Sequence, residues 1–222
     1  MSLILNLETA TKNCSVSISK NGQNVTYKEV ADQNYSHAEK LHAFIADLLK
    51  EQNLSYSDLN AVAVSQGPGS YTGLRIGVSA AKGLCYALGI PLIAINTLES
   101  IASAKKIDFG YIIPMIDARR QEVYMSIFNS KMEEIQATSA KIIDSNSFDY
   151  LDGKIHFLGD GCSKFKELFT DDRFVFHDDV PFPSALQMAK LSFDKFQLEN
   201  FEDVAYFEPY YFKDFIVPTK KK

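Results

Sequence analysis

The first thirty residues alternate between apolar and polar positions in three short runs. Leu3–Leu7, Cys14–Ser19 and Gln23–Val30 have the two-residue period of β-strands. Lys20-Asn21-Gly22, between the last two runs, is a tight-turn signal, because Asn and Gly tolerate the positive φ that such turns need. We therefore expect the chain to open with three antiparallel strands, the first ending at the acidic residue Glu8.

A helical period replaces the alternation after residue 35. Ser36 and Glu39 have the spacing of a capping box, in which each side chain satisfies a free backbone amide at the other position. Helix-forming residues then continue through Lys50. The apolar residues at helical spacing, which make one face, are Leu41, Phe44, Ile45, Leu48 and Leu49. This pattern predicts an amphipathic helix over residues 36–50.

A strand, a glycine-rich turn and a second helix follow. Asn60–Ser65 is a short apolar run typical of a buried strand, and Gln66–Ser70 leads from it into a helix that we expect to end near Leu88, where Gly89 and Pro91 stop it. Pro91–Ile95 is the next expected strand.

The second half of the chain repeats the opening pattern. Ile112–Ile116 is apolar and ends at Asp117, a charged turn follows, Glu122–Phe128 alternates, and a third extended stretch leads to Ile143. Internal repeats bear strongly on architecture, although short alternating segments also recur by chance. A duplicated unit of this kind is similar to the actin, hexokinase and Hsp70 ATPase folds.

We therefore predict an α/β fold of the actin-like, ribonuclease H-like kind, with two lobes that each contain a mixed sheet. The lobe boundary is expected within Ser103–Phe109, giving an N-terminal lobe over residues 1–105 and a smaller C-terminal lobe over 106–222. In the second lobe, Ile155–Leu158 and Gly159–Gly161 read as a strand and a turn, and Ser184–Gln197 as a helix.

Composition and charge limit the classes of function that fit this chain. The chain has 222 residues, a net charge of −5 and no apolar run of the roughly 18 residues that a membrane span needs. Three cysteines without CxxC spacing favour neither disulfides nor a thiolate metal site, and Leu3–Leu7 is too short for a signal-peptide core, so we expect a cytoplasmic protein. The acidic balance disfavours direct binding of tRNA phosphates; Lys220–Lys222 is read as a solvated terminus.

Residues 67–73, GPGSYTG, lie between a strand and a helix, where backbone amides can hold a phosphate. They lack both the Lys-Ser/Thr ending of a P-loop and GxGxxG spacing, so a tight turn with Ser70 or Thr72 as the helix cap is the better-supported reading. If a nucleotide binds here, Glu8, Gly67, Gly69 and Ser70 are the candidate residues.

The second helix has an unusual series of small residues. Gly69, Gly73, Gly77 and Ala81 recur every four positions and leave one side nearly bare. Glycine inside a helix costs about 1 kcal/mol relative to alanine, so the series predicts the close approach of another backbone. That backbone belongs either to the lobe's own sheet or to a helix of another subunit.

The stretch QGPGSYTGLRIGVSAAKGL over Gln66–Leu84 resembles the TsaB (YeaZ) family over nearly the whole of that family's signature. Further agreement comes from ILNLETATKNCSVSI, IPLIAINTLESIA, PMIDARRQEVYMSIF and the Pro-Tyr segment Glu208–Tyr211, so the resemblance covers the whole chain. It implies the two-lobed actin-like fold.

The resemblance also implies a scaffolding role in the synthesis of threonylcarbamoyladenosine on tRNA. Members of this family pair with TsaD, which performs the transfer, and the ATPase TsaE joins them; alone they form homodimers. The helices matching residues 36–50 and 70–88 are implied to make the contact. The partner-binding residues expected on this basis are His37, Leu41, Phe44, Ile45, Leu48, Tyr71, Gly73, Leu74, Gly77, Val78 and Ala81.

Cofactors and catalysis have weaker signals. ATP or ADP could be held at the partner interface, and tRNA contact is expected to be indirect. His37 and His42 are five residues apart, so they diverge by about 140° around a helix and do not share an ion, unlike the HxxxH pair of TsaD. Asp117, Arg119 and Glu122 could be catalytic, but paired surface charges on a hairpin are favoured. The alternative function is a free-standing actin-like ATPase or kinase acting through Glu8.

Overall fold

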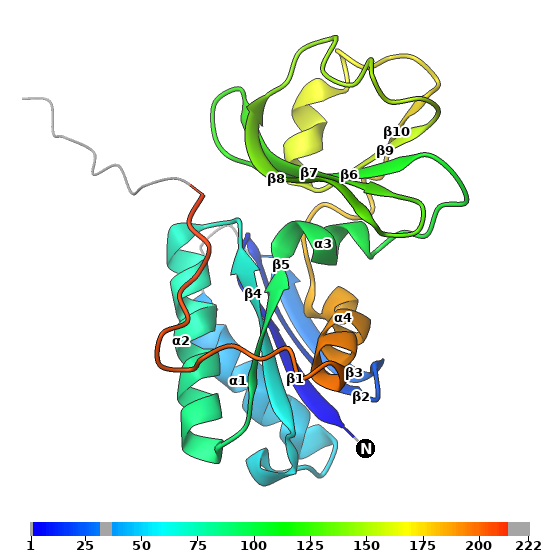
Figure 1. The fold of residues 1–222 in the computed structure, drawn as a ribbon. Helices are drawn as coiled ribbons and strands as arrows, with labels where there is room; N and C mark the ends of the chain where they lie inside the picture. Colours follow the sequence, from blue (N-terminus) through cyan, green and yellow to red (C-terminus); the bar gives the residue numbers. More distant parts are fainter. Residues whose placement is uncertain (1, 32–36, 213–222) are drawn as a thin grey trace, which may run out of the picture.

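The computed structural model describes residues 2–31 and 37–212. Two lobes lie one above the other, and each is built around one five-stranded mixed sheet (Figure 1). No helix within the described residues is both long and apolar enough to cross a membrane.

The first sheet has the strand order β3-β2-β1-β4-β5. Strands β1 (Leu3–Glu8), β2 (Asn13–Lys20) and β3 (Gln23–Ala31) form the expected antiparallel unit, and β4 (Ala61–Gly67) and β5 (Leu92–Asn96) run parallel to β1. The alternation of β2 sends Cys14, Val16 and Ile18 to one face and serines to the other, and both faces are buried. The predicted strands are confirmed to within two residues.

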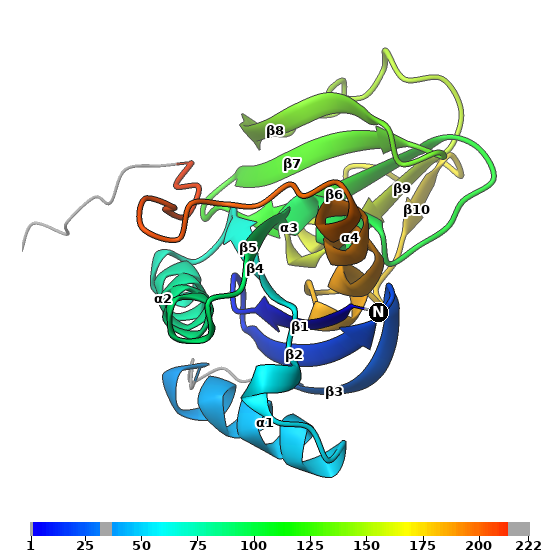
Figure 2. The ribbon, with the colours of Figure 1, turned by 60° about the horizontal axis from the view of Figure 1, so that its bottom comes forward.

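Helices cover both faces of this sheet (Figure 2). On one face lie α1 (His37–Glu51) and α2 (Tyr71–Leu88), whose apolar sides form a core with Cys14, Val16 and Ile18. A short 3-10 helix, η1 (Tyr56–Asp58), follows α1. The helix predicted over residues 36–50 is confirmed in its described part, and Ser36, its predicted cap, lies outside the described residues.

The opposite face is covered by α4 (Ala185–Gln197), with α3 (Thr97–Ala102) beside it. The sequence predicted α4 but assigned it to the second lobe, and the structure differs. Ser17 Oγ donates to the carbonyl of Ala185 at 2.8 Å, and Ser192 Oγ donates to Asn6 Oδ1 at 2.7 Å. The polar face of β1 and β2 therefore holds α4 in the first lobe.

The second sheet repeats the first strand for strand, in the order β10-β9-β6-β7-β8. Its members are β6 (Tyr111–Asp117), β7 (Glu122–Asn129), β8 (Glu134–Ile142), β9 (Ile155–Leu158) and β10 (Phe174–Phe176). As in the first sheet, three antiparallel strands come first and two strands parallel to the first one follow. The predicted duplication and the two-lobed α/β fold are confirmed.

Several phenylalanine side chains pack together in the core of the second lobe. Its crossover connections contain turns and one 3-10 helix, η2 (Asp160–Phe165), and the core beneath them combines phenylalanines with aliphatic side chains. Phe148, Phe157 and Phe169 lie with ring centroids 5.4 to 5.5 Å apart. The sequence predicted neither this cluster nor the short elements α3 and β10.

The chain passes between the lobes twice, through residues 103–110 and again through 177–184. Lys105 Nζ lies 2.5 Å from Asp179 Oδ2, so the two passages run side by side. Residues 185–211 then pack with the first lobe, because α4 contacts β1, β2 and β5, and Phe207 packs on the core beneath α2, whereas the ring of Phe212 lies 5.6 Å from that of Tyr124 in the second lobe.

Candidate functional site

The glycine-rich loop before α2 packs against the turn that follows β1. Ser70 N donates to the Ala10 carbonyl at 2.6 Å, and a Cβ on Gly69 would lie 2.4 Å from the same oxygen. Ser70 Oγ accepts from Gly73 N at 3.3 Å and caps α2. The interpretation of this segment as a turn and cap is confirmed at Ser70.

Glu8 lies fully buried at the end of β1, next to Ser65 of β4. Its carboxylate accepts a short hydrogen bond from Ser65 Oγ and another from Ala10 N at 2.6 Å. Burial raises the pKa of Glu8 from 4.5 to about 7, although the hydrogen bonds oppose that shift. Both carboxylate oxygens are engaged inside the lobe, so Glu8 joins β1 to β4 and does not face solvent.

The helical glycines Gly73 and Gly77 meet the chain's own turn. A Cβ on Gly73 would lie 2.1 Å from the carbonyl oxygen of Thr9, and one on Gly77 would lie 2.3 Å from Thr9 Oγ1. Thr9 Oγ1 also donates to the Gly73 carbonyl at 2.7 Å. The predicted close neighbour of these glycines is therefore part of the lobe itself, at Thr9, and not a helix of another subunit.

Most side chains named for partner contact lie in the core. The buried members are His37, Leu41, Ile45, Leu48, Gly73, Leu74, Gly77, Val78 and Ala81, whereas Phe44 and Tyr71 are half-buried. His37 Nε2 lies 2.7 Å from the Thr11 carbonyl. The apolar period of α1 and α2 marks the side that packs on the sheet, so a partner would meet the other side.

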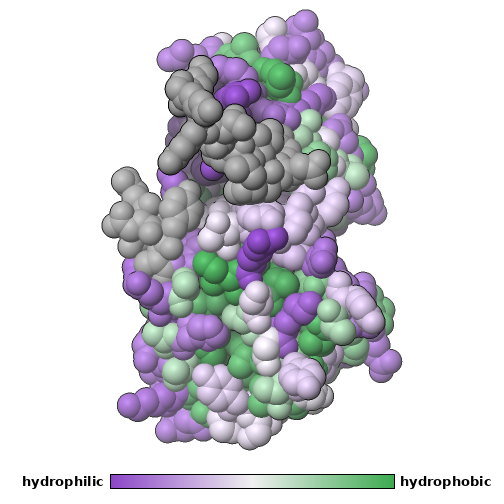
Figure 3. Space-filling view, turned by 90° about the vertical axis from the view of Figure 1, so that its left-hand side faces the viewer, coloured by the Kyte–Doolittle hydropathy of each residue, from purple (hydrophilic) through white to green (hydrophobic). Residues whose placement is uncertain are grey.

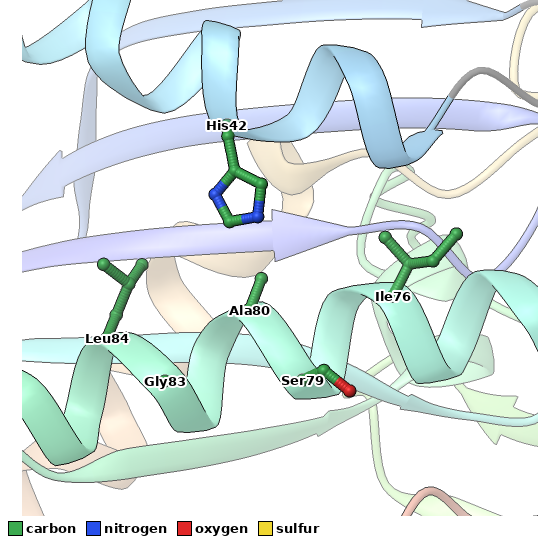
Figure 4. Close-up of a pocket in the computed structure, with 6 residues that line it drawn as sticks. All are labelled: His42, Ile76, Ser79, Ala80, Gly83 and Leu84. Atoms are coloured by element: carbon green, nitrogen blue, oxygen red, sulfur yellow. The ribbon is translucent and has the colours of Figure 1, made fainter.

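That outward side contains a groove of about 330 Å³ between α1 and α2 (Figure 4). Ile76, Ala80 and Leu84 of α2 point toward α1, and His42 of α1 points back toward them. Ser79 and Gly83 complete the lining. In a view onto this side of the molecule, apolar patches lie among polar ones across the first lobe (Figure 3).

Gly83 differs from the two buried helical glycines. It is exposed, and a Cβ there would meet nothing within 4 Å. The chain therefore gives no internal reason for a helical glycine that costs about 1 kcal/mol relative to alanine. Gly83 was not predicted from the sequence, because it falls outside the series at 69, 73 and 77. The available signal was the exposed small-residue series Ser79, Gly83 and Ala87.

The charged residues after β6 form paired surface contacts. Lys164 Nζ lies 2.5 Å from Asp117 Oδ1, which also accepts from Arg119 N at 2.6 Å. Asp160 Oδ1 accepts from Asp117 N at 3.0 Å. Arg119 and Glu122 lie on the same hairpin, and Arg119 has a left-handed φ of 71°. These contacts accord with the reading as hairpin surface charges.

The histidines of the second lobe form a close pair. His156 Nδ1 lies 2.9 Å from His177 Nε2, and burial lowers the pKa of both. Among residues 2–31 and 37–212 there is no group of three or more His, Cys, Asp or Glu side chains placed to hold a metal ion.

Comparison with known proteins gives consistent results. The family model described as "TsaD: tRNA N6-adenosine threonylcarbamoyltransferase" matches residues 28–220. The chain is 29% identical over 220 residues to "tRNA threonylcarbamoyladenosine biosynthesis protein TsaB" of Escherichia coli (strain K12), covering 95% of this chain and 94% of that protein. A protein of the same name from Bacillus subtilis (strain 168) is 32% identical over 142 residues, covering 61% and 62%.

Solved structures support the same fold. "YeaZ from Pseudomonas aeruginosa" superposes with a TM-score of 0.84 at 24% identity, covering 95% of this chain and 100% of that one. The ethanolamine utilization protein EutJ from Carboxydothermus hydrogenoformans has a TM-score of 0.52 at 12% identity, covering 85% and 89%.

Proposed function

This chain belongs to the TsaB (YeaZ) family of the actin-like superfamily, and we propose that it is a non-catalytic scaffold subunit in the biosynthesis of threonylcarbamoyladenosine on tRNA. In this role it binds a TsaD-type transferase through the outward sides of α1 and α2. The transferase performs the chemistry, and this chain holds it in a competent assembly.

The observation that carries the proposal is the exposed Gly83 beside the apolar groove. Helix packing distances depend on the side chains at the contact, so a bare position lets a second helix approach closely. Ile76, Ala80 and Leu84 supply apolar surface that a docked helix would cover. A helix on this groove would therefore give Gly83 the close neighbour that the chain itself lacks.

A TsaD-type chain is the proposed occupant because it is related to this one. The family model for TsaD matches residues 28–220, a span that includes both α1 and α2. A partner with the equivalent helix pair could meet this pair about a local twofold axis, as in other self-complementary interfaces. A second copy of this chain would present the same helices, so a homodimer is the form expected when TsaD is absent.

The geometry at Glu8 favours an accessory role over a free-standing ATPase or kinase. A carboxylate that acts on a metal-bound phosphate must reach solvent or ligand, and Glu8 is fully buried against Ser65 and Ala10. We propose accordingly that any ATP or ADP is held between subunits, that TsaE joins through the complex, and that tRNA contact is mainly through the partner.

Gly83→Leu tests the docking assignment. Gly77→Leu does not, because its side chain would enter the space of Thr9 and disturb the fold. We expect Gly83→Leu to weaken binding of the TsaD protein from the same genome by at least about 30-fold, the size of an interface hot spot, when measured by titration calorimetry. Lys190→Leu places the same side chain on the outward side of α4 and should bind like the parent chain.

The pathway role has a separate test. Modification of tRNA is reconstituted with TsaD, TsaE, the threonylcarbamoyl-adenylate synthase and tRNA, with or without this chain. We expect modification to require the chain and to fall with Gly83→Leu. Full modification of tRNA without the chain would refute the scaffold role. Binding of TsaD by Gly83→Leu with the affinity of the parent chain would refute docking at the α1/α2 surface.

A further inference from the structure

A segment after α4 lies along the other side of α2 from the groove. This C-terminal strap, Phe201–Phe212, bridges to the edge of β5 through Glu202 and Leu92 and then crosses α2 (Figures 1 and 2). None of its side chains is fully buried, and Tyr206 is 84% exposed, although Val204 and Phe207 pack against the core of the first lobe. Core formation therefore accounts for only part of its path.

Dedicated contacts nevertheless fix that path. Lys82 Nζ of α2 donates to the carbonyls of Ala205 at 3.2 Å and Phe207 at 2.8 Å. Tyr210 N donates to the Gln66 carbonyl at 2.7 Å, and a Cβ on Gly67 would lie 2.6 Å from the carbonyl oxygen of Tyr210. Lys82 thus holds the strap through hydrogen bonds, and Gly67 leaves the space that the strap backbone occupies.

Arg75 makes the third attachment. Its Nε donates to Tyr211 Oη at 3.1 Å, and its guanidinium lies 4.0 Å from the centre of the Tyr71 ring. The rings of Tyr71 and Tyr211 are 4.7 Å apart. Arg75 and Lys82 are seven residues apart, so they lie on nearly the same side of α2, and both hold the strap.

Between the strap and α2 there is a second groove, of about 240 Å³. Its walls include Arg75, Lys82, Phe207, Glu208 and Tyr211, and Ser79 borders both this groove and the one beside α1. The outward ridge of α2 therefore lies between two grooves, one mainly apolar and one lined by two cations, one carboxylate and aromatic rings.

We propose that the strap is the second wall of the docking face, and that the partner engages α2 from both sides. This inference rests on the proposed docking of a TsaD-type helix pair: one helix occupies the α1/α2 groove and the other lies against the strap. Tyr86 on α2 and Tyr206 on the strap are 85% and 84% exposed, and tyrosine is enriched at the centres of protein interfaces.

The lining of the strap groove specifies the chemistry of the second partner helix. Arg75 and Lys82 present two positive charges on the α2 side of it, against the single carboxylate of Glu208 on the strap, and a guanidinium has five N–H donors, of which Nε is directed to Tyr211. A helix with Asp or Glu on its docking side fits this groove, with the tyrosines packing on its aliphatic stems.

Hydrogen exchange on the intact chain, diluted until it is monomeric, with and without the TsaD protein from the same genome, separates the two proposals. We expect backbone amides of the strap to exchange at least about tenfold more slowly in the complex, together with those of α1 and α2. Protection of α1 and α2 alone would overturn the strap inference and leave the docking proposal intact. Faster exchange in the strap would show displacement and also overturn the inference, whereas no protection anywhere would overturn both.

Lys82→Met provides an independent test. Methionine keeps an unbranched stem but removes both hydrogen bonds to the strap, and we expect the TsaD protein to bind about tenfold more weakly. Lys190→Met makes the same change on α4 and should leave binding unchanged, and thermal unfolding of both variants checks that the fold persists. Binding of Lys82→Met within twofold of the parent chain would refute a role for the strap.

Discussion

The two lobes differ in how they connect the last three strands of each sheet. In the first lobe these connections are residues 32–60 and 68–91, which contain α1 and α2. In the second lobe they are residues 143–154 and 159–173, which contain only turns and η2. Strand order and direction are the same in both sheets. The second lobe packs phenylalanines together with aliphatic side chains from these connections against its sheet instead. Long crossover helices are therefore not required to close this fold, and the outward surface of those in the first lobe is where we propose that a partner docks.

The acidic residues that end β1 and β6 show the same divergence. Ala10 N donates to Glu8 and Arg119 N donates to Asp117, in both cases at 2.6 Å across two residues, so the local geometry is duplicated. Glu8 is sealed against Ser65, whereas Asp117 is exposed and paired with Lys164. One turn geometry thus supports a buried junction in one lobe and a surface ion pair in the other.

The largest expected effect concerns the aromatic core of the second lobe. Phe157→Ala should lower the free energy of unfolding by about 3 to 5 kcal/mol, because Phe157 is fully buried and contacts four other phenylalanine rings. Urea denaturation of the parent chain and the variant measures this difference. A loss below 1 kcal/mol would mean that the phenylalanines do not replace the missing helices.

The next effect concerns Glu8, the buried acidic residue at the end of β1. Burial raises the pKa of Glu8 to about 7, so the folded state retains a proton that the unfolded state releases near pH 4.5. The contribution of protonated Glu8 to the free energy of unfolding is therefore fully present below pH 4.5. It decreases as the pH rises to 7, by roughly 3 kcal/mol in total.

Glu8→Gln should remove that decrease, so that the variant gains stability relative to the parent chain as the pH rises from 4.5 to 7. Parallel profiles for Glu8→Gln and the parent chain, measured by urea denaturation at several pH values, would contradict the sealed state of Glu8.

The smallest effect compares the two sides of α2. Gly83→Ala should stabilise the chain in its monomeric form by about 0.5 to 1 kcal/mol, because alanine favours the helix and the new methyl meets no atom of this chain. Gly73→Ala should destabilise it, since the methyl would collide with the Thr9 carbonyl. Thermal unfolding gives both signs, and destabilisation by Gly83→Ala would show that position 83 is constrained within the lobe.

Local patterns predicted the strands and the long helices of this fold because their periods are set by burial on one or two sides. Cys14, Val16 and Ile18 alternate with serines, so β2 could be recognised from its residues alone. The docking of α4 onto those serines could not, because it joins residues about 170 positions apart through polar contacts such as Ser15 with Ser184. The short element α3 likewise has too few residues to establish a period.

The candidate site was only partly predictable for a related reason. Leu41 and Ile45 were correctly recognised as part of the apolar side of a helix, but a single sequence does not distinguish a side that faces the sheet from one that faces a partner. Gly83 gains its meaning only when the nearby space is seen to be empty. The strap contacts of Lys82 depend on the path of residues 201–212, which has no periodic pattern.

The ion pair between Lys105 and Asp179 has a consequence for how the molecule is assembled. At this ion pair the chain segment that enters the second lobe lies beside the segment that leaves it. The second lobe is therefore an insertion between two parts of the chain that pack together in the first lobe. Such insertions preserve the host domain when their two ends are close. The segment 106–178 could therefore be exchanged or shortened during evolution while α1, α2 and the strap kept their arrangement.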